Sequence, residues 1–217
     1  MIKKGDFIRV EYTAYDDKKN MFDSTSGEIA KQLHGKEGPL LIIFGSDRLI
    51  QGLEEAVATM HKGDKKELTI QPEKAFGFRS KDLIKVFPES ELLRRNINPR
   101  VGVVLELDTE EGKLFGNIKS INSGRVTMDF NHPLAGKIVK YEITLVDLIH
   151  ENKEKISSML EDMDLNGKII VNGDSVEIEM SKPKDDKKQD YEQKKQFLPE
   201  MIKTFITDIK NVNIKEV

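Results

Sequence analysis

Side chains that could do covalent or metal chemistry are few and widely spaced in this 217-residue chain. It has no cysteine, which excludes a thiolate metal site, a cysteine nucleophile and a disulfide framework. Its four histidines, His34, His61, His132 and His150, occur singly, and no phosphate-binding or dinucleotide-binding glycine motif is present. We therefore expect no metal, no cofactor and no nucleophilic triad. We interpret His132, next to Pro133, as a turn residue whose ring caps a backbone group.

What remains is a set of aromatic side chains near the ends of the predicted elements. It includes Phe22, Phe44 and Phe76, together with Tyr12 and Tyr141 on strand faces. Residues of this kind more often belong to a core than to a site. The pattern alone leaves both interpretations open.

Charge and hydropathy exclude several classes of partner. Charged residues make up 34% of the chain but nearly cancel to a net charge of -3, so no overall field attracts phosphate backbones. The amino terminus has no apolar signal segment, and the longest apolar run, LLIIF, is far too short to span a membrane. We expect a soluble cytoplasmic protein that binds neither nucleic acid nor membranes.

The elements that position these side chains begin with a β-rich unit. DFIRVEYTAY alternates, with Ile8, Val10, Tyr12 and Ala14 on one face, and predicts a half-buried antiparallel strand. KKELTIQP and KIVKYEITLVDL follow the same pattern. Between the first two, DRLIQGLEEAVATMHKG has helical spacing and predicts one amphipathic helix that ends at Gly63.

A second β unit interrupts the first. PESELLRR predicts a short helix, and RVGVVLEL, KLFGNIKSI and RVTMDF predict strands joined by turns. Because another strand of the first type follows, we interpret residues 86–130 as an insertion into the first unit.

After Asp147 the pattern becomes helical again. ENKEKISSMLEDM predicts a helix, NGKIIVNGDSVEIEM a hairpin, and the charged run KPKDDKKQDYEQKKQ a solvated helix or linker. Pro199 is predicted to start a last helix, which is followed by a strand, VNIKEV. That helix carries an apolar stripe made of Met201, Ile202, Phe205, Ile206 and Ile209.

Four motifs in order, FDST, FGSDRLIQGLEEAVATMHKGDKKELTI, PEKAFG and NHPLAGKIVKYEITLVDL, resemble the FKBP-type peptidyl-prolyl cis-trans isomerases. The match is to the SlyD-like branch with an inserted flap domain, and most closely to the long archaeal members that carry an extra C-terminal domain. It covers residues 1–149. The resemblance implies an apolar pocket floored by the helix and flanked by the NHPLAG loop, lined here by Tyr12, Phe22, Asp23, Phe44, Leu49, Ile50, Leu53, Phe76, Leu134 and Tyr141.

Two departures from the family pattern concern its ligands. Leu53 stands where small members have a tryptophan pocket floor, and the histidine-rich metal-binding tail of bacterial SlyD is absent. The resemblance therefore carries over no metal role. For Asp23, the one charge expected beside the pocket, we favour acceptance of a hydrogen bond from a neighbouring tyrosine over proton transfer.

An apolar pocket suits the implied reaction. Rotation about a peptide bond faces a barrier of about 18–20 kcal/mol, and X-Pro isomerisation takes about tens to hundreds of seconds. The twisted transition state has lost the charge separation of the planar amide, so apolar walls bind it selectively and lower the barrier without a nucleophile.

The insert has more apolar positions than so small a unit readily buries. A tight minicore and an exposed client-binding surface fit its composition equally, and the resemblance favours the surface. We expect client contacts from Val86, Phe87, Leu92, Leu93, Val103, Leu105, Phe115 and Met128.

The prediction is an α+β protein in three parts: an isomerase domain of residues 1–85 plus 131–149, an insert-in-flap chaperone domain of residues 86–130, and a C-terminal α+β domain of residues 150–217. Its clients are unfolded or nascent polypeptides that contain X-Pro. The alternative is a non-catalytic holdase or assembly scaffold that keeps the fold. The apolar stripe and the final strand predict a homodimer through the C-terminal domain; the alternative, a monomer whose hairpin covers the stripe, is nearly as well supported.

Overall fold

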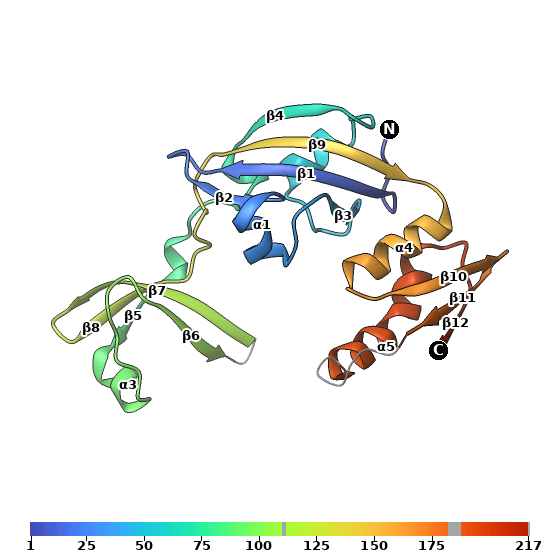
Figure 1. Cartoon of the computed structure of the whole chain (residues 1–217). Helices are drawn as coiled ribbons and strands as arrows, with labels where there is room; N and C mark the ends of the chain where they lie inside the picture. Colours follow the sequence, from blue (N-terminus) through green and yellow to red (C-terminus); the bar gives the residue numbers. More distant parts are fainter. Residues whose placement is uncertain (110–111, 182–187, 217) are drawn as a thin grey trace. The chain divides into compact units, whose positions relative to one another are not determined.

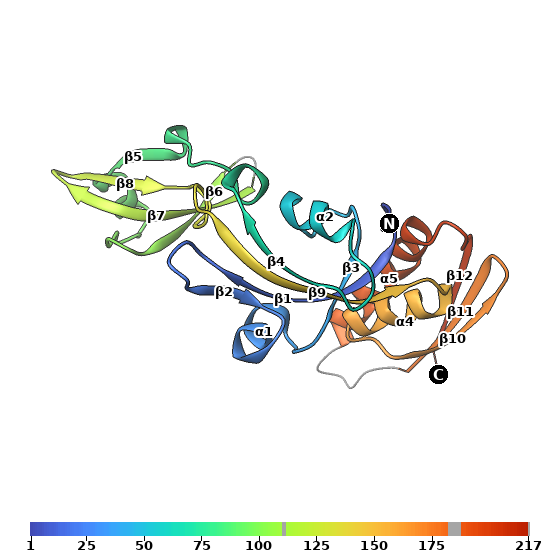
Figure 2. The same ribbon diagram turned by 90° about the horizontal axis from the view of Figure 1, so that it is seen from above.

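The computed structural model describes residues 1–109, 112–181 and 188–216 and shows an α+β protein (Figures 1 and 2). Its chain forms two compact units. The first unit consists of Met1–Ile70 with Lys140–Val217, and the second unit of Gln71–Val139. The predicted C-terminal domain thus belongs to the same compact unit as residues 1–70.

The first unit is built on a five-stranded sheet of order β2-β1-β9-β4, in which β3 also pairs with β1. Its strands are β1 (Phe7–Tyr15), β2 (Met21–Ser24), β3 (Leu40–Ile43), β4 (Lys65–Ile70) and β9 (Val139–Ile149). β1 is antiparallel to β2, β3 and β9. Ile8, Val10 and Ala14 are buried while Glu11 is exposed, which confirms the predicted alternation along β1.

Two helices accompany this sheet, where one was predicted. α2 (Gln51–Val57) is the predicted helix, shorter than the sequence pattern suggested. α1 (Gly27–His34) was not predicted, because Ala30 is its one fully buried residue and it therefore shows no apolar stripe. α1 packs beside β2.

The C-terminal part of the first unit carries a three-stranded sheet of order β10-β11-β12 with two helices. Its elements are α4 (Asn152–Asp162), β10 (Gly167–Asn172), β11 (Ser175–Met180), α5 (Lys188–Phe205) and β12 (Asn211–Glu216). The predicted hairpin is confirmed, and β12 pairs in parallel with β11. The first residues of the charged run, 182–187, lie outside the described residues.

The prediction that Pro199 starts the last helix is wrong. Pro199 lies inside α5, which already begins at Lys188. Tyr191 and Leu198, both upstream of Pro199, are buried, and this packing extends the helix through charged residues that have no periodic pattern of their own.

One hydrophobic core joins the five-stranded sheet to the C-terminal elements. Phe7, Leu41, Ile43 and Ile149 belong to the same buried cluster as side chains of α4, α5 and the three-stranded sheet. Among those side chains are Ile156, Met159, Leu160, Ile178, Leu198 and Ile202, and Ile206 and Ile209, which follow α5, belong to the same cluster. The stripe predicted to form a dimer is therefore largely buried within its own chain.

Hydrogen bonds and ion pairs between α4 and the first 50 residues border this shared core. Arg9 of β1 donates to Oγ of Ser158 at 2.9 Å and pairs with Glu161 at 2.6 Å. Lys36 donates to the backbone oxygen of Glu161, and Arg48 pairs with Asp162 at 3.3 Å. Isolated exposed pairs contribute little, so the buried apolar surface dominates this contact.

The second unit contains a four-stranded antiparallel sheet of order β5-β8-β7-β6. Its elements are β5 (Ile84–Pro88), α3 (Glu89–Arg94), β6 (Val104–Thr109), β7 (Gly112–Asn122) and β8 (Arg125–Asp129), preceded by short 3₁₀ turns at Pro72–Lys74 and Lys81–Leu83. α3 packs against β5. The core of this unit is formed by Leu92, Ile118, Val126, Met128 and Phe130.

A buried carboxylate fastens the two chain segments that enter and leave this sheet. Asp129, 4% exposed, accepts a hydrogen bond from Arg79 and two from Asn131. Asn131 in turn donates to the backbone oxygen of Ser80 and accepts from its N–H. Residues 79–80 and 129–131 are thus held together at the base of the sheet.

Candidate functional site

Asp23 is the centre of a hydrogen-bonded cluster in the first unit. It lies in β2, opposite Ala14 of β1. Its Oδ2 accepts a hydrogen bond of 2.8 Å from the Tyr12 hydroxyl, and its Oδ1 lies 2.8 Å from Nε2 of His34. The side chains of Asp23 and His34 are only 23% and 19% exposed. The carboxylate is therefore held from two sides in a sheltered position.

Aromatic rings surround this carboxylate. The Tyr12 ring lies 5.8 Å from that of Tyr141 and 6.4 Å from that of His34, between centroids. Phe22 meets Tyr141 edge to face at 6.0 Å, a favourable arrangement for aromatic pairs. The structure thus brings Tyr12, Phe22, Asp23 and Tyr141, from three strands, into one cluster.

The two tyrosines of the cluster differ in what their hydroxyls can do. Burial, reinforced by the Asp23 carboxylate, raises the pKa of both Tyr12 and Tyr141 above the usual tyrosine value, so both stay protonated. The Tyr12 proton is committed to Asp23. Among the described residues the Tyr141 hydroxyl has no hydrogen-bond partner, and solvent reaches its oxygen. The Tyr141 hydroxyl therefore keeps a donor that no described residue uses.

The helix α2, predicted to form the floor of the pocket, packs closely against the sheet. Leu53 of α2 is 3% exposed, while Ile50 and Leu49, just before the helix, are half-buried. A Cβ on Gly52 would come within 2.5 Å of the Ile70 side chain at the end of β4. Glycine at position 52 therefore lets α2 approach the sheet and fixes the position of Leu53.

The structure places Phe44 away from the predicted wall. Phe44 follows β3 and lines a cavity of about 410 Å³, together with Lys4, Lys155 and Phe205. This cavity lies toward the C-terminal elements. An aromatic residue next to Gly45 gave no signal of which side of the strand it would face.

Two predicted site residues, Phe76 and Leu134, belong to the second unit. The Phe76 ring stacks on the His132 ring with centroids 4.5 Å apart and planes 2° from parallel. Nδ1 of His132 accepts the backbone N–H of Leu134 at 3.2 Å, as the interpretation of His132 as a turn residue requires. Burial lowers the pKa of His132, which favours this neutral, accepting form.

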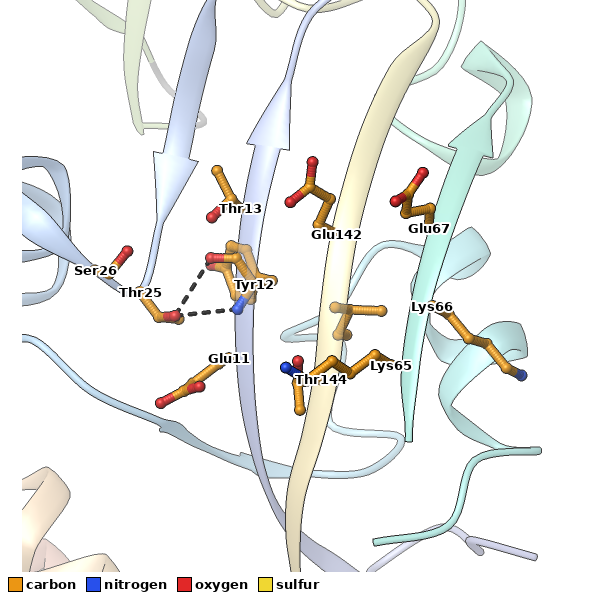
Figure 3. A pocket seen from close by; sticks show the side chains of 11 residues that line it. Glu11, Tyr12, Thr13, Thr25, Ser26, Lys65, Lys66, Glu67, Glu142 and Thr144 are labelled. Carbon is orange, nitrogen blue, oxygen red and sulfur yellow. Dashed lines mark hydrogen bonds between the residues drawn. The ribbon is translucent and has the colours of Figure 1, made fainter. Parts of the chain in front are cut away.

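A polar hollow of about 640 Å³ lies along β1, β9 and β4 (Figure 3). Its lining includes the carboxylates of Glu11, Glu67 and Glu142. Tyr12 contributes its backbone, which Thr25 holds by accepting from its N–H at 3.0 Å and donating to its oxygen at 3.3 Å. This hollow offers few apolar walls, so we do not assign the isomerase site to it.

His34 is a functional candidate that the sequence prediction missed. It was treated as one of four scattered histidines, and nothing in its spacing from Asp23 indicates contact. The available signal was its place directly before Gly35, which marks the end of a helix.

The clustered side chains form a candidate binding site. It combines aromatic walls, one fixed carboxylate and one available phenol. Among the residues that the structure describes, no group of three or more acidic or histidine side chains is placed to hold a metal ion. Within the same residues, no helix is long and apolar enough to cross a membrane.

Comparison with known proteins agrees with this class of site. Residues 1–93 match the family model of the FKBP-type peptidyl-prolyl cis-trans isomerase, and residues 85–134 match that of the FKBP26 IF domain. A short-type peptidyl-prolyl cis-trans isomerase of Methanocaldococcus jannaschii is 35% identical over 153 residues, which cover 68% of this chain and 94% of the relative.

Bacterial relatives show the same similarity. An FKBP-type 16 kDa isomerase of Escherichia coli is 34% identical over 58% of this chain and 83% of its own length. An isomerase of Helicobacter pylori named SlyD is 29% identical over 54% of this chain and 63% of its own length. The chain belongs to the FKBP-type peptidyl-prolyl cis-trans isomerase family.

Proposed function

We propose that this isomerase acts on X-Pro bonds in unfolded or nascent polypeptides and that its second unit binds these clients. Binding on the second unit would present a client to the isomerase site of the same chain at a raised local concentration. The proposal gives the second unit a chaperone role.

The observation that carries this proposal is an exposed apolar surface on the four-stranded sheet. Val86 of β5, Val104 of β6 and Phe115 of β7 are 57%, 58% and 57% exposed. Strand pairing and alternation place all three on the face opposite the core residues Ile118 and Met128. Apolar side chains on a sheet face with free edge strands fit an extended, unfolded chain.

The surface differs in part from the predicted one. Leu92 and Met128 are 2% and 0% exposed and belong to the core of the unit, so they do not reach a client. Phe87 and Leu105 pack against the same core. Val86 and Phe115 remain from the prediction, with Val104 added, and Leu93 of α3 and Val103, just before β6, remain exposed candidate contacts beside this sheet face.

For the site itself, we propose that Tyr141 donates a hydrogen bond to a client carbonyl. Phe22 and Ile50, both half-buried, supply apolar surface to the twisted amide, whose reduced polarity favours such surroundings, and the buried Leu53 holds α2 in place. Asp23 keeps the Tyr12 ring in place through the 2.8 Å bond to its hydroxyl. No step requires proton transfer.

The test separates peptide catalysis from client binding. Val86→Ser, Val104→Ser and Phe115→Ser, combined in the full chain, should leave activity on a short prolyl peptide unchanged and remove most of the acceleration of a proline-limited refolding reaction. The matched control replaces Asn117 and Thr127, polar residues of the same face, with serine. Equal refolding acceleration by both variants would refute client binding at this surface.

The alternative of a non-catalytic holdase makes an opposite prediction. A protease-coupled assay with a short prolyl peptide would then show no acceleration by the wild-type protein. The Tyr12, Asp23 and Tyr141 cluster supports the enzyme, since a scaffold has no need of an oriented phenol beside an apolar wall.

We also propose a homodimer formed through β12. The apolar stripe from which the sequence predicted a dimer is largely buried within the chain. The strand β12, however, lies at the edge of its sheet and is mostly exposed. An edge of this kind can pair with a second copy. Light scattering over a dilution series tests it, and a monomeric mass at micromolar concentration would rule it out.

A further inference from the structure

His34 lies where a helix end meets the site. It is the last residue of α1, and Gly35 follows it with φ 75°, donating its N–H to the backbone oxygen of Lys31. This left-handed cap ends the helix at His34, beside β2. The imidazole is mostly covered and meets the Asp23 carboxylate through Nε2.

Two hydrogen bonds prevent the Asp23 carboxylate from rotating, whereas one hydrogen bond does not. The terminal torsion of an aspartate is broad, so a carboxylate bonded only to Tyr12 could still rotate. With Tyr12 at Oδ2 and His34 at Oδ1, the two oxygens are fixed separately. The position of the Tyr12 hydroxyl, and of the ring that carries it, then depends on His34.

We propose that His34 is a positioning residue of the isomerase: it orients Asp23, and through Asp23 it holds the Tyr12 wall against Tyr141. The proposal rests on the assignment of Asp23 to the site. His34 does not touch the client. Its effect is on how well the site fits the twisted amide, so its loss should lower kcat more than it changes KM.

The charged groups around His34 support this specific pairing. Asp23 faces it from β2, and the Tyr12 ring meets it edge-on from β1. On its own helix, Lys31 is already paired with Glu28 and Glu37. Asp23 is therefore the carboxylate paired with this imidazole.

The experiment measures protease-coupled kcat/KM on a short prolyl peptide with the full chain. His34→Leu should lower it by about 12- to 140-fold, the range expected for losing one hydrogen bond to a charged group. His34→Gln should restore most of the activity, because its amide N–H can donate from about the position of Nε2. Leu33→Gln, at the exposed neighbour on the same helix, is the matched control and should match wild type.

A double-mutant cycle completes the test. If His34 acts through Asp23, adding His34→Leu to Asp23→Asn should cost almost nothing further. Wild-type activity in Asp23→Asn alone would overturn the site assignment. If Asp23→Asn is less active than wild type, three results would overturn the role of His34. These are full activity of His34→Leu, additive losses in the double variant, and no recovery of activity in His34→Gln.

Discussion

Tyr141 offers a test of the site by removal of a single atom. Tyr141→Phe deletes one oxygen from a side chain that is 4% exposed and keeps the ring contacts with Tyr12 and Phe22. Because that oxygen has no partner among the described residues, the change breaks no hydrogen bond in that part of the protein. We expect the free energy of unfolding to stay the same or to rise slightly.

Activity should respond differently from stability. A hydrogen bond between neutral groups contributes about 0.5–1.5 kcal/mol, so loss of the bond to a client carbonyl should lower kcat/KM by about 2- to 12-fold. Protease-coupled kinetics and thermal unfolding of the same preparation measure both quantities.

Tyr12→Phe is the matched comparison. It also removes one phenolic oxygen, but that oxygen donates to the Asp23 carboxylate at 2.8 Å. Loss of a bond to a charged group costs about 1.5–3 kcal/mol of stability. The reasoning is refuted if Tyr141→Phe is fully active, or if it destabilises the protein as much as Tyr12→Phe does.

Three further changes probe other parts of the structure. Phe76→Ala should lower kcat/KM strongly. It should cost less stability than the about 3–5 kcal/mol lost when a core phenylalanine is truncated, since Phe76 is only half-buried and stacks on the His132 ring. Full activity of this variant, with an unfolding midpoint near that of wild type, would contradict the prediction. Burial raises the pKa of Asp129, but hydrogen bonds from Asn131 and Arg79 outweigh it and lower the folded pKa below the unfolded value of 3.8, so the ionised carboxylate stabilises the fold above that pH. Asp129→Asn should therefore reduce the loss of stability that the protein shows below about pH 4. An unchanged pH dependence of acid unfolding in this variant would contradict the prediction. Truncation after His150 should yield a chain without a cooperative melting transition, and a wild-type transition would show that the C-terminal elements are dispensable.

The strands of the isomerase sheet could be predicted because their signal is local. β1 and β9 alternate between buried and exposed residues, and a sheet with one solvated face imposes that period directly. α1 and the true start of α5 could not be predicted in this way. Ala30 is the only buried residue of α1, and α5 begins among charged residues whose helical state depends on burial of Tyr191 and Leu198.

Of the candidate site residues, the sequence predicted some neighbours correctly and missed others. Tyr12, Asp23 and Tyr141 followed from the family motifs and do meet in the structure. His34 was missed and Phe44 faces another cavity, because both depend on which way a chain turns after an element ends. The local sequence pattern predicts which face of a strand a residue occupies. The direction that the chain takes after a helix or strand ends depends on packing against residues far away in the sequence.

The shared core has a consequence for the synthesis of the protein. Phe7 is synthesised 195 residues before Ile202 and 199 residues before Ile206, which belong to the same buried cluster. At about 5–20 residues per second, the interval between them is roughly 10–40 seconds. During that time an apolar side of the isomerase sheet lacks its cover and is open to aggregation. A protein of the folding machinery would thus itself depend on protection while it is being made.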